Sequence, residues 1–216
     1  MKIFLDSVNF PEISKYASYG ILDGVTTNPT LVASSSMEFS EIISKLHSTI
    51  KGDISIEVAA EDYETMIKEG EKILAIASDS VIKLPITWDG IKACNYFAKK
   101  NVKVNMTLCF SVNQALLVAK AGAAYVSPFI GRLEEIGEDG IGLIADIRSV
   151  YDNYGLKTEI LAASVRTLEH VEQSALCGAD AITMPVRILS TLIEHDLTSS
   201  GIKKFSEDWI KSGKKL

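Results

Sequence analysis

The stretch VIKLP, residues Val81 to Pro85, is an apolar segment with a single lysine inside it. Its apolar members indicate a buried strand, and Pro85 favours the end of that strand because proline has no N–H group for a sheet ladder. Lys83 is the unusual residue, since an ammonium group in apolar surroundings must be paired, reach water or lose its proton. Two interpretations stay open: a lysine paired or solvated for structural reasons, or a desolvated lysine that acts as a nucleophile.

Seven other apolar segments precede helical patterns in the same way as this one. The eight predicted strands are Ile3 to Leu5, Leu22 to Val25, Ile54 to Val58, Val81 to Pro85, Val102 to Leu108, Ala123 to Val126, Thr158 to Ala162 and Ala181 to Met184. Strict alternation of strand and helix predicts right-handed βαβ units and a parallel sheet. Eight such units favour an α/β fold that closes into a (β/α)8 TIM barrel. A doubly wound open sheet is the alternative, although no G-x-G-x-x-G motif follows any strand and a dinucleotide site is not predicted.

The helical segments begin at capping residues, and no linker divides them. Side chains suited to an N-cap precede four of the helices: Asn9, Asp62, Ser111 and Thr167. The end of the chain predicts two closing helices, Pro185 to His195 and Leu197 to Lys211. Residues 1–216 are therefore expected to form a single barrel domain, with about 197–216 as an extra C-terminal helix that serves no strand.

Composition narrows the class of protein. The chain has 216 residues, 47% of them hydrophobic, and no segment approaches the roughly 20 uninterrupted apolar residues of a membrane span. A net charge of −6 argues against nucleic-acid binding, which needs a dense basic face. The N-terminus reaches Asp6 after a short apolar run, so no secretory signal is predicted, and three scattered cysteines indicate a reducing cytoplasm. Three widely spaced histidines support neither a zinc site nor a histidine-based triad.

Polar residues stand at the ends of the predicted strands, where the active site of such a barrel lies. They are Asp6, Asn28, Glu57, Lys83, Asn105, Thr107, Ser127, Arg132, Ser164 and Arg166. Some have a structural alternative: Asp6 and Ser164 suit turn caps, and Asn28 suits an Asx turn. Thr107 is also an ordinary strand residue, and Ser127 an ordinary turn residue before a proline. The complete set nevertheless predicts one polar site at one mouth of the barrel.

Glu57 and two arginines indicate which kind of reaction this mouth of the barrel could support. Alternation along the strand puts Glu57 on the same face as Ser55, toward the barrel interior. Arg132 and Arg166 follow the sixth and seventh strands with few partners nearby, and such guanidinium groups suit a phosphate site. A nucleophilic amine, two carboxylates and a phosphate anchor favour Schiff-base chemistry on a phosphorylated carbonyl compound, with no metal and no organic cofactor.

Four motifs resemble those of a known family. They are GVTTNPT from Gly24 to Thr30, VIKLP from Val81 to Pro85, SPFIGR from Ser127 to Arg132 and AASVR from Ala162 to Arg166. Together they resemble the transaldolase family, and the closest likeness is to its short subfamily, which also contains fructose-6-phosphate aldolase. The resemblance covers essentially the whole chain, including the helix from Lys203 to Lys211.

The resemblance implies a role for each site residue. Lys83 matches the Schiff-base lysine of the family, and Asp6 matches the carboxylate that moves the proton of the substrate's C4 hydroxyl. Glu57 and Thr107 match the pair that positions a catalytic water. The matches among substrate ligands are Asn28, Asn105 and Ser127 at the dihydroxyacetone moiety, and Arg132, Ser164 and Arg166 at the phosphate. Arg187, just after the last strand, has no counterpart.

Three positions separate transfer from simple aldol cleavage within the subfamily. In its aldolase branch the position of Glu57 is typically glutamine, that of Phe129 tyrosine and that of Asn105 apolar. This chain has the residues found in transaldolases, and Phe129 therefore joins the substrate-binding residues. The resemblance thus implies a class I transaldolase. Such an enzyme moves a dihydroxyacetone unit from fructose 6-phosphate or sedoheptulose 7-phosphate to erythrose 4-phosphate or glyceraldehyde 3-phosphate.

Other interpretations stay open beside this one. Fructose-6-phosphate aldolase, which releases free dihydroxyacetone, is the near alternative, and a non-catalytic sugar-phosphate-binding barrel is the distant one. The resemblance implies a cytoplasmic enzyme of the pentose phosphate pathway whose partners are phosphorylated sugars, with no nucleic acid, membrane or cofactor. Relatives form pentameric rings that pair into decamers, so we expect a homo-oligomer. Phe205 and Trp209 on the last helix suit contact with a neighbouring copy.

Overall fold

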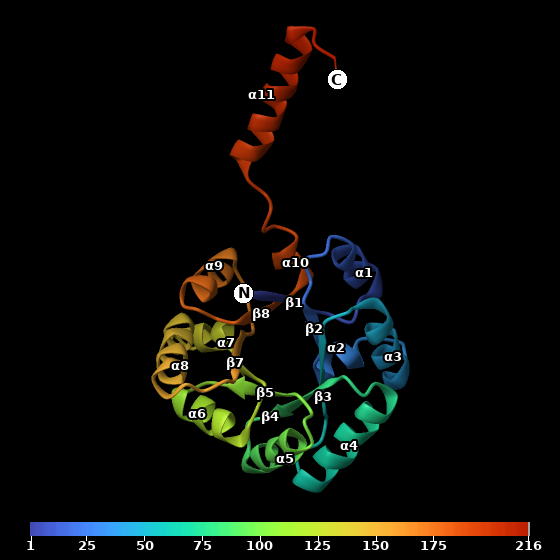
Figure 1. The fold of residues 1–216 in the computed structure, drawn as a ribbon, viewed down its shortest axis with the longest axis vertical. Helices are drawn as coiled ribbons and strands as arrows, with labels where there is room; N and C mark the ends of the chain where they lie inside the picture. The colour runs from blue at the N-terminus through green and yellow to red at the C-terminus, as the bar shows by residue number, and fades with distance from the viewer. Residues whose placement is uncertain (216) are drawn as a thin grey trace.

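A computed structural model describes residues 1–215 and arranges them around one closed barrel (Figure 1). The strands β1 to β8 are parallel, follow one another in chain order around the wall, and close where β1 pairs with β8. Helices surround this wall on its outside. The protein is therefore the (β/α)8 TIM barrel predicted from its alternating pattern.

Among the described residues, each strand is followed by one or two helices. The strands are β1 (Lys2–Asp6), β2 (Gly24–Thr26), β3 (Asp53–Glu57), β4 (Val81–Pro85), β5 (Val104–Cys109), β6 (Tyr125–Pro128), β7 (Glu159–Ala162) and β8 (Ala181–Met184). The helices are α1 (Phe10–Ser18), α2 (Pro29–Ala33), α3 (Phe39–Thr49), α4 (Tyr63–Ile76), α5 (Trp88–Lys99), α6 (Val112–Ala121), α7 (Ile130–Glu135), α8 (Gly140–Tyr154), α9 (Leu168–Leu176), α10 (Val186–Leu189) and α11 (Asp196–Ser212). All the predicted strands are present.

Capping side chains begin the helices where the sequence predicts them. Asn9, Asp62, Ser111 and Thr167 each accept a hydrogen bond from a main-chain N–H of the first turn. Each bond satisfies one of the donors that a helix start leaves without a partner in the helix. These caps therefore set where the chain leaves the mouth of the barrel and enters the outer layer.

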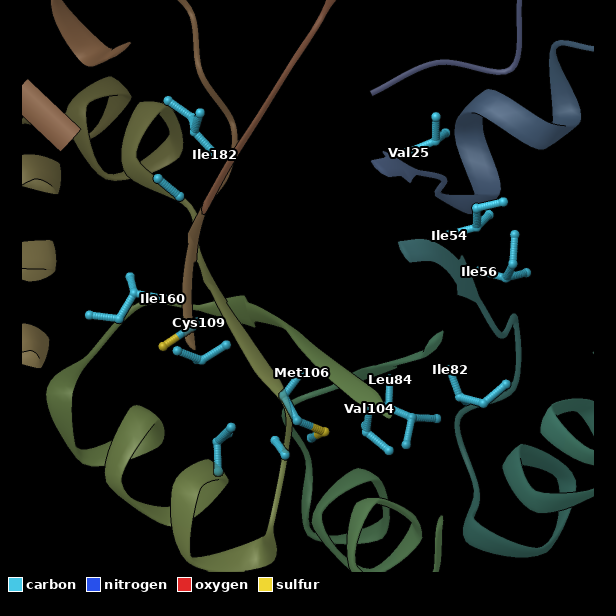
Figure 2. Packing of buried hydrophobic residues seen from close by; sticks show 14 of the residues in the cluster. Val25, Ile54, Ile56, Ile82, Leu84, Val104, Met106, Cys109, Ile160 and Ile182 are labelled. Carbon is cyan, nitrogen blue, oxygen red and sulfur yellow. The ribbon is translucent and has the colours of Figure 1, made fainter. Parts of the chain in front are cut away.

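Alternation along each strand divides its side chains between two environments. Ile54 and Ile56 on β3, and Ile160 on β7, lie on the outer side of the wall, where they join the core formed with the helices (Figure 2). Ile82 and Leu84 belong to the same outer core. Successive side chains of a strand point to opposite faces, so Lys83, which lies between Ile82 and Leu84, points into the barrel.

The amino-terminal half of the barrel interior is filled by side chains. Phe4, Val81, Tyr125, Leu161 and Ala181 form a separate buried cluster inside the wall. The rings of the phenylalanine and the tyrosine meet edge to face with centroids 5.9 Å apart. The interior is thus closed at this end, and polar groups have room only toward the carboxyl ends of the strands.

Polar side chains cover the closed end of the barrel. The hydroxyl of Tyr125 donates to Asp53 at 2.6 Å, and Lys103 pairs with the same carboxylate at 2.8 Å. Lys2 pairs with Glu159 at 2.7 Å on the other side of the tyrosine. Burial acts to raise the pKa of Asp53, but hydrogen bonds from Lys103 and Tyr125 and the charges of both lysines outweigh it, and the pKa is lowered.

Three short helices differ from the prediction. α2 and α7 were not predicted, since five and six residues are too few to show a helical period. The predicted helix from Pro185 to His195 is wrong in length, because only α10 is helical and turns follow it. Both new helices lie at the carboxyl ends of strands, directly after β2 and β6, and so they border the mouth of the barrel.

The last helix, α11, extends away from the barrel (Figure 1). None of its residues is buried, and its large apolar side chains are exposed: Leu197, Ile202, Phe205, Trp209 and Ile210. The predicted extension over about 197–216 is helical to Ser212, and its last residue, Leu216, lies outside the described residues. Across residues 1–215, no helix has the length and apolar character needed to cross a membrane.

Candidate active site

The carboxyl ends of the strands surround a cavity of about 190 Å³. Its lining residues are Asp6, Thr26, Asn28, Lys83, Ser127, Phe129, Arg132, Ala163, Ser164, Arg166 and Thr183. Eight of the predicted site residues are among them, although they come from five different strand ends. A second cavity of about 430 Å³ shares Asn28, Phe129 and Arg132 with the first and adds Glu57. The parallel topology therefore gathers the predicted polar residues at one mouth.

Lys83 is held by two partners inside the barrel. In the strand register it is paired with Glu57 on β3 and with Asn105 on β5. Its Nζ lies 2.9 Å from Oε2 of Glu57 and donates to the main-chain oxygen of Thr27 at 2.7 Å. The lysine side chain is only 6% exposed and the glutamate side chain 12%. The ammonium group of Lys83 is therefore paired with a buried carboxylate.

Asp6 lies at the carboxyl end of β1, in the same cavity as Lys83. Its Oδ1 accepts a hydrogen bond from Oγ1 of Thr26 at 2.8 Å, and this hydroxyl also lies 2.6 Å from that of Thr183. Burial raises the pKa of Asp6 above its ordinary value, while the charge of Lys83 and the hydrogen bond from Thr26 limit the increase. A carboxylate with a raised pKa is a stronger base, which suits it to accept a proton from a bound hydroxyl.

Asn105, Ser127 and Thr107 form a buried polar layer. Nδ2 of Asn105 donates to Oγ of Ser55 at 3.0 Å, and its Oδ1 accepts from Oγ of Ser127 at 2.8 Å. Thr107 is completely buried, and its Oγ1 has no hydrogen-bond partner among the described residues. A buried hydroxyl without a protein partner is costly, so its position favours a site that binds water or a ligand hydroxyl.

Phe129 lines both cavities and lies beside an arginine. Its ring meets that of Phe110 edge to face, with centroids 5.9 Å apart, and the guanidinium of Arg132 lies 5.4 Å from its centroid. Within residues 1–215, no carboxylate forms an ion pair with Arg132. This guanidinium is therefore available to an anion at the cavity mouth.

Arg166 and Ser164 lie in the loop after β7, which packs against α7. Nη1 of Arg166 pairs with Oε1 of Glu135 at 2.5 Å, and the N–H of Gly131 donates to the main-chain oxygen of Ser164 at 3.2 Å. Ser164 has φ of +60°, in the left-handed region that a residue with a side chain adopts at a cost. A Cβ on Gly131 would overlap the oxygen of Ser164 and lie 2.7 Å from Nε of Arg166, so only glycine fits there.

Asn28 combines its predicted structural role with a place at the site. Its Oδ1 caps α2 by accepting from the N–H of Leu31 at 2.9 Å, and the residue lines both cavities. Sequence reasoning missed Thr26, Ala163 and Thr183, which also line the smaller cavity. Thr26 ends β2 as the register partner of Asp6, and Thr183 is the next-to-last residue of β8, so their places near strand ends were the available signal.

A closed parallel barrel with a polar cavity at the carboxyl ends of its strands defines a (β/α)8 protein with the site position of a TIM-barrel enzyme. The profile described as Transaldolase/Fructose-6-phosphate aldolase matches residues 3–216, and the chain belongs to this family. Proteins named probable transaldolase from Brucella ovis and Caulobacter vibrioides are each 51% identical to it, and one from Bartonella bacilliformis is 49% identical. Each comparison spans 216 residues and 100% of both chains. The family resemblance of the four motifs is confirmed.

Proposed function

We propose that the protein is a transaldolase that transfers a dihydroxyacetone unit between sugar phosphates through a Schiff base on Lys83. The observation that carries the proposal is the cavity itself, because one space is lined by an interior lysine, the carboxylate of Asp6 and the guanidinium groups of Arg132 and Arg166. Family membership supports an enzyme that transfers aldehyde or ketone residues. The donor would be fructose 6-phosphate or sedoheptulose 7-phosphate.

The reaction begins at Lys83. Glu57, 2.9 Å from Nζ, takes the proton of the ammonium group, and the free amine adds to the C2 carbonyl of fructose 6-phosphate. The carbinolamine then loses water and becomes an imine. This step requires a proton on the departing hydroxyl, which Glu57 returns through a water held by Thr107. The unpartnered hydroxyl of Thr107 supports this role.

Asp6 acts in the second step. Its carboxylate takes the proton of the C4 hydroxyl, the bond between C3 and C4 breaks, and the electron pair passes into the imine to give an enamine. Glyceraldehyde 3-phosphate leaves with the phosphate. The pKa of Asp6, raised by burial, supports this assignment because a stronger base removes the hydroxyl proton more readily.

The enamine then adds to a second aldehyde. Its carbon attacks the carbonyl carbon of erythrose 4-phosphate, and the new alkoxide takes the proton from Asp6. Water hydrolyses the resulting imine, which releases sedoheptulose 7-phosphate and restores Lys83. Arg132, Arg166 and Ser164 hold the phosphate of each substrate in turn, while Asn28, Asn105 and Ser127 bind the hydroxyl groups of the three-carbon unit.

Transfer is preferred to release because of the residues beside the enamine. Phe129 has no hydroxyl to protonate the enamine, and its ring packs on Phe110 next to the cavity. The three-carbon unit therefore stays on the lysine until an aldehyde arrives. The alternative is a fructose-6-phosphate aldolase, which protonates the enamine and releases dihydroxyacetone.

An acceptor-dependence assay tests the proposal. Glyceraldehyde 3-phosphate formation from fructose 6-phosphate is measured with and without erythrose 4-phosphate, together with free dihydroxyacetone. Beyond one equivalent of glyceraldehyde 3-phosphate per site, we expect product only in proportion to the acceptor, and borohydride should trap the three-carbon fragment on Lys83. Free dihydroxyacetone without acceptor supports the aldolase, and sugar-phosphate binding with no trapped adduct supports a non-catalytic barrel.

We also propose that the protein works as a homo-oligomer, a pentamer or decamer, in a reducing cytoplasm. The exposed apolar side chains of α11 support the oligomer, because a helix that buries nothing on its own chain suits a neighbouring copy. The three unpaired cysteines support the compartment. Sedimentation of the full chain and of a chain ending at residue 195 tests the oligomer, and truncation should reduce the assembly to smaller species.

A further inference from the structure

The main chain of Arg166 is held on both sides by side chains that the proposed chemistry does not use. Its N–H donates to Nδ1 of His170 at 3.1 Å. Its carbonyl oxygen accepts from Nη1 of Arg187 at 3.2 Å. The loop that carries this arginine is therefore fixed by two contacts outside the cavity, one from α9 and one from α10.

The two hydrogen bonds of His170 define which nitrogen of its ring carries the hydrogen. The residue is only 5% exposed. Since Nδ1 accepts the N–H of Arg166, this nitrogen carries no proton, and Nε2 carries the hydrogen. Nε2 lies 2.6 Å from Oε2 of Glu134, so it donates to that carboxylate. Each ring nitrogen thus has one partner, and the two partners lie on different segments.

Those two segments are the ones that carry the phosphate-site arginines. Glu134 belongs to α7, which also contains Arg132, and Arg166 belongs to the loop after β7. The chain Glu134–His170–Arg166 therefore joins the two arginine-bearing segments through one buried ring. A hydrogen-bonded carboxylate on one nitrogen orients the ring and strengthens the other nitrogen as an acceptor.

We propose that His170, supported by Glu134 and assisted by Arg187, is a positioning residue that sets the place of the Arg166 guanidinium for the phosphate of the substrate. His170 lies outside the group that lines the cavity, so it acts only through the main chain of Arg166. The inference rests on the proposed function, since it assigns a phosphate site to that arginine.

Three substitutions of His170 distinguish positioning from general support. The side-chain oxygen in His170→Asn occupies the place of Nδ1 and can accept from Arg166, whereas the longer side chain in His170→Gln reaches toward Glu134 instead. His170→Ala keeps neither contact. Arg187→Ala removes the second contact from an exposed residue, so folding is not at risk.

The main measurement is the dissociation constant of inorganic phosphate, determined by titration calorimetry on the full chain. We expect His170→Ala and His170→Gln to weaken phosphate binding roughly tenfold, and His170→Asn to stay within about threefold of the unchanged protein. Arg187→Ala should weaken it about threefold. Equal binding by the unchanged protein and by His170→Gln, or equal loss in the Asn and Gln variants, would overturn the proposal.

A kinetic split and a matched control complete the test. KM for fructose 6-phosphate should rise with the loss of phosphate affinity, while turnover of unphosphorylated fructose should change little. His47→Ala is the control. The ring of His47 also contacts two partners, Ser80 and Asp79, but this residue lies in the last turn of α3, away from the mouth of the barrel. It should lower thermal stability without changing phosphate binding. Phosphate binding that depends on His170 in a protein without transferase activity would overturn the proposed function and leave the positioning role intact.

Discussion

The Nζ of Lys83 lies 2.9 Å from Oε2 of Glu57, and the two residues are register partners on adjacent parallel strands. Removing the carboxylate by Glu57→Ala would leave a buried ammonium with only the oxygen of Thr27. We expect imine formation to slow by roughly a hundredfold, because the proton acceptor is lost. The free energy of unfolding should also fall by about 3 kcal/mol, as it does when one partner of a buried ion pair is removed.

The rate of borohydride-trapped adduct formation measures this effect. Glu57→Gln should be intermediate, because an amide still accepts a hydrogen bond from Lys83 but takes no proton. Glu61→Gln, at an exposed position in the loop after β3, is the matched control and should trap at the unchanged rate. Equal trapping by Glu57→Ala and the unchanged protein would contradict the role of Glu57.

The pH dependence of the reaction should report Asp6. The base form is needed, so activity is lost as pH falls through its pKa, which burial places above the ordinary carboxyl value of about 3.9. Thr26→Val removes a hydrogen bond that favours the carboxylate, so the acidic limb of kcat/KM should move to still higher pH. The measurement is kcat/KM from pH 4 to 9, and a limb that stays in place would contradict the assignment.

Phe129 should decide the fate of the enamine. Phe129→Tyr adds a hydroxyl beside the cavity, and we expect free dihydroxyacetone to appear without an acceptor at a rate at least about tenfold above that of the unchanged protein. Phe110→Tyr is the control, because its ring touches that of Phe129 but does not line the smaller cavity. Release that rises equally in both variants, or in neither, argues against this explanation of transfer.

Gly131 should be required for phosphate recognition. In Gly131→Ala the new methyl group would overlap the main-chain oxygen of Ser164 and crowd Nε of Arg166. We expect KM for fructose 6-phosphate to rise by about tenfold or more, because the arginine loses its position. Gly201→Ala adds the same group in open space on α11 and should leave KM unchanged. Unchanged KM in Gly131→Ala would show that the loop relaxes at no cost.

Much of the fold follows from local pattern, because each strand is a short apolar segment and each long helix has a cap and an apolar face. α2, α7 and α10 were missed or wrong in length because five, six and four residues contain hardly more than one turn. Such helices are set by tertiary contacts, as when Ile130 and Gly131 donate to the loop after β7. Local propensity contributes little to elements of this length.

In the candidate site, too, some features could be predicted from the sequence and others could not. Its polar residues could be predicted because a parallel barrel brings every strand end to one mouth. The contacts of Arg166 with Glu135 and Arg187 could not, since these residues belong to different elements that are far apart in the sequence. The same holds for the pairing of Lys83 with Glu57, which depends on strand register. Sequence identifies the groups, and tertiary structure decides which of them touch.

The packed amino-terminal half of the barrel has a kinetic consequence. Phe4 and Tyr125 fill the interior on the far side of Lys83, so the cavity is closed at that end and opens only toward the carboxyl ends of the strands. A molecule that enters past Arg132 and Arg166 must leave by the same route. In the proposed transfer, the first aldehyde product would therefore have to depart before the second aldehyde enters, and donor and acceptor would not occupy the cavity together. The order of events would then be ping-pong, with parallel double-reciprocal plots and each substrate in excess inhibiting the other.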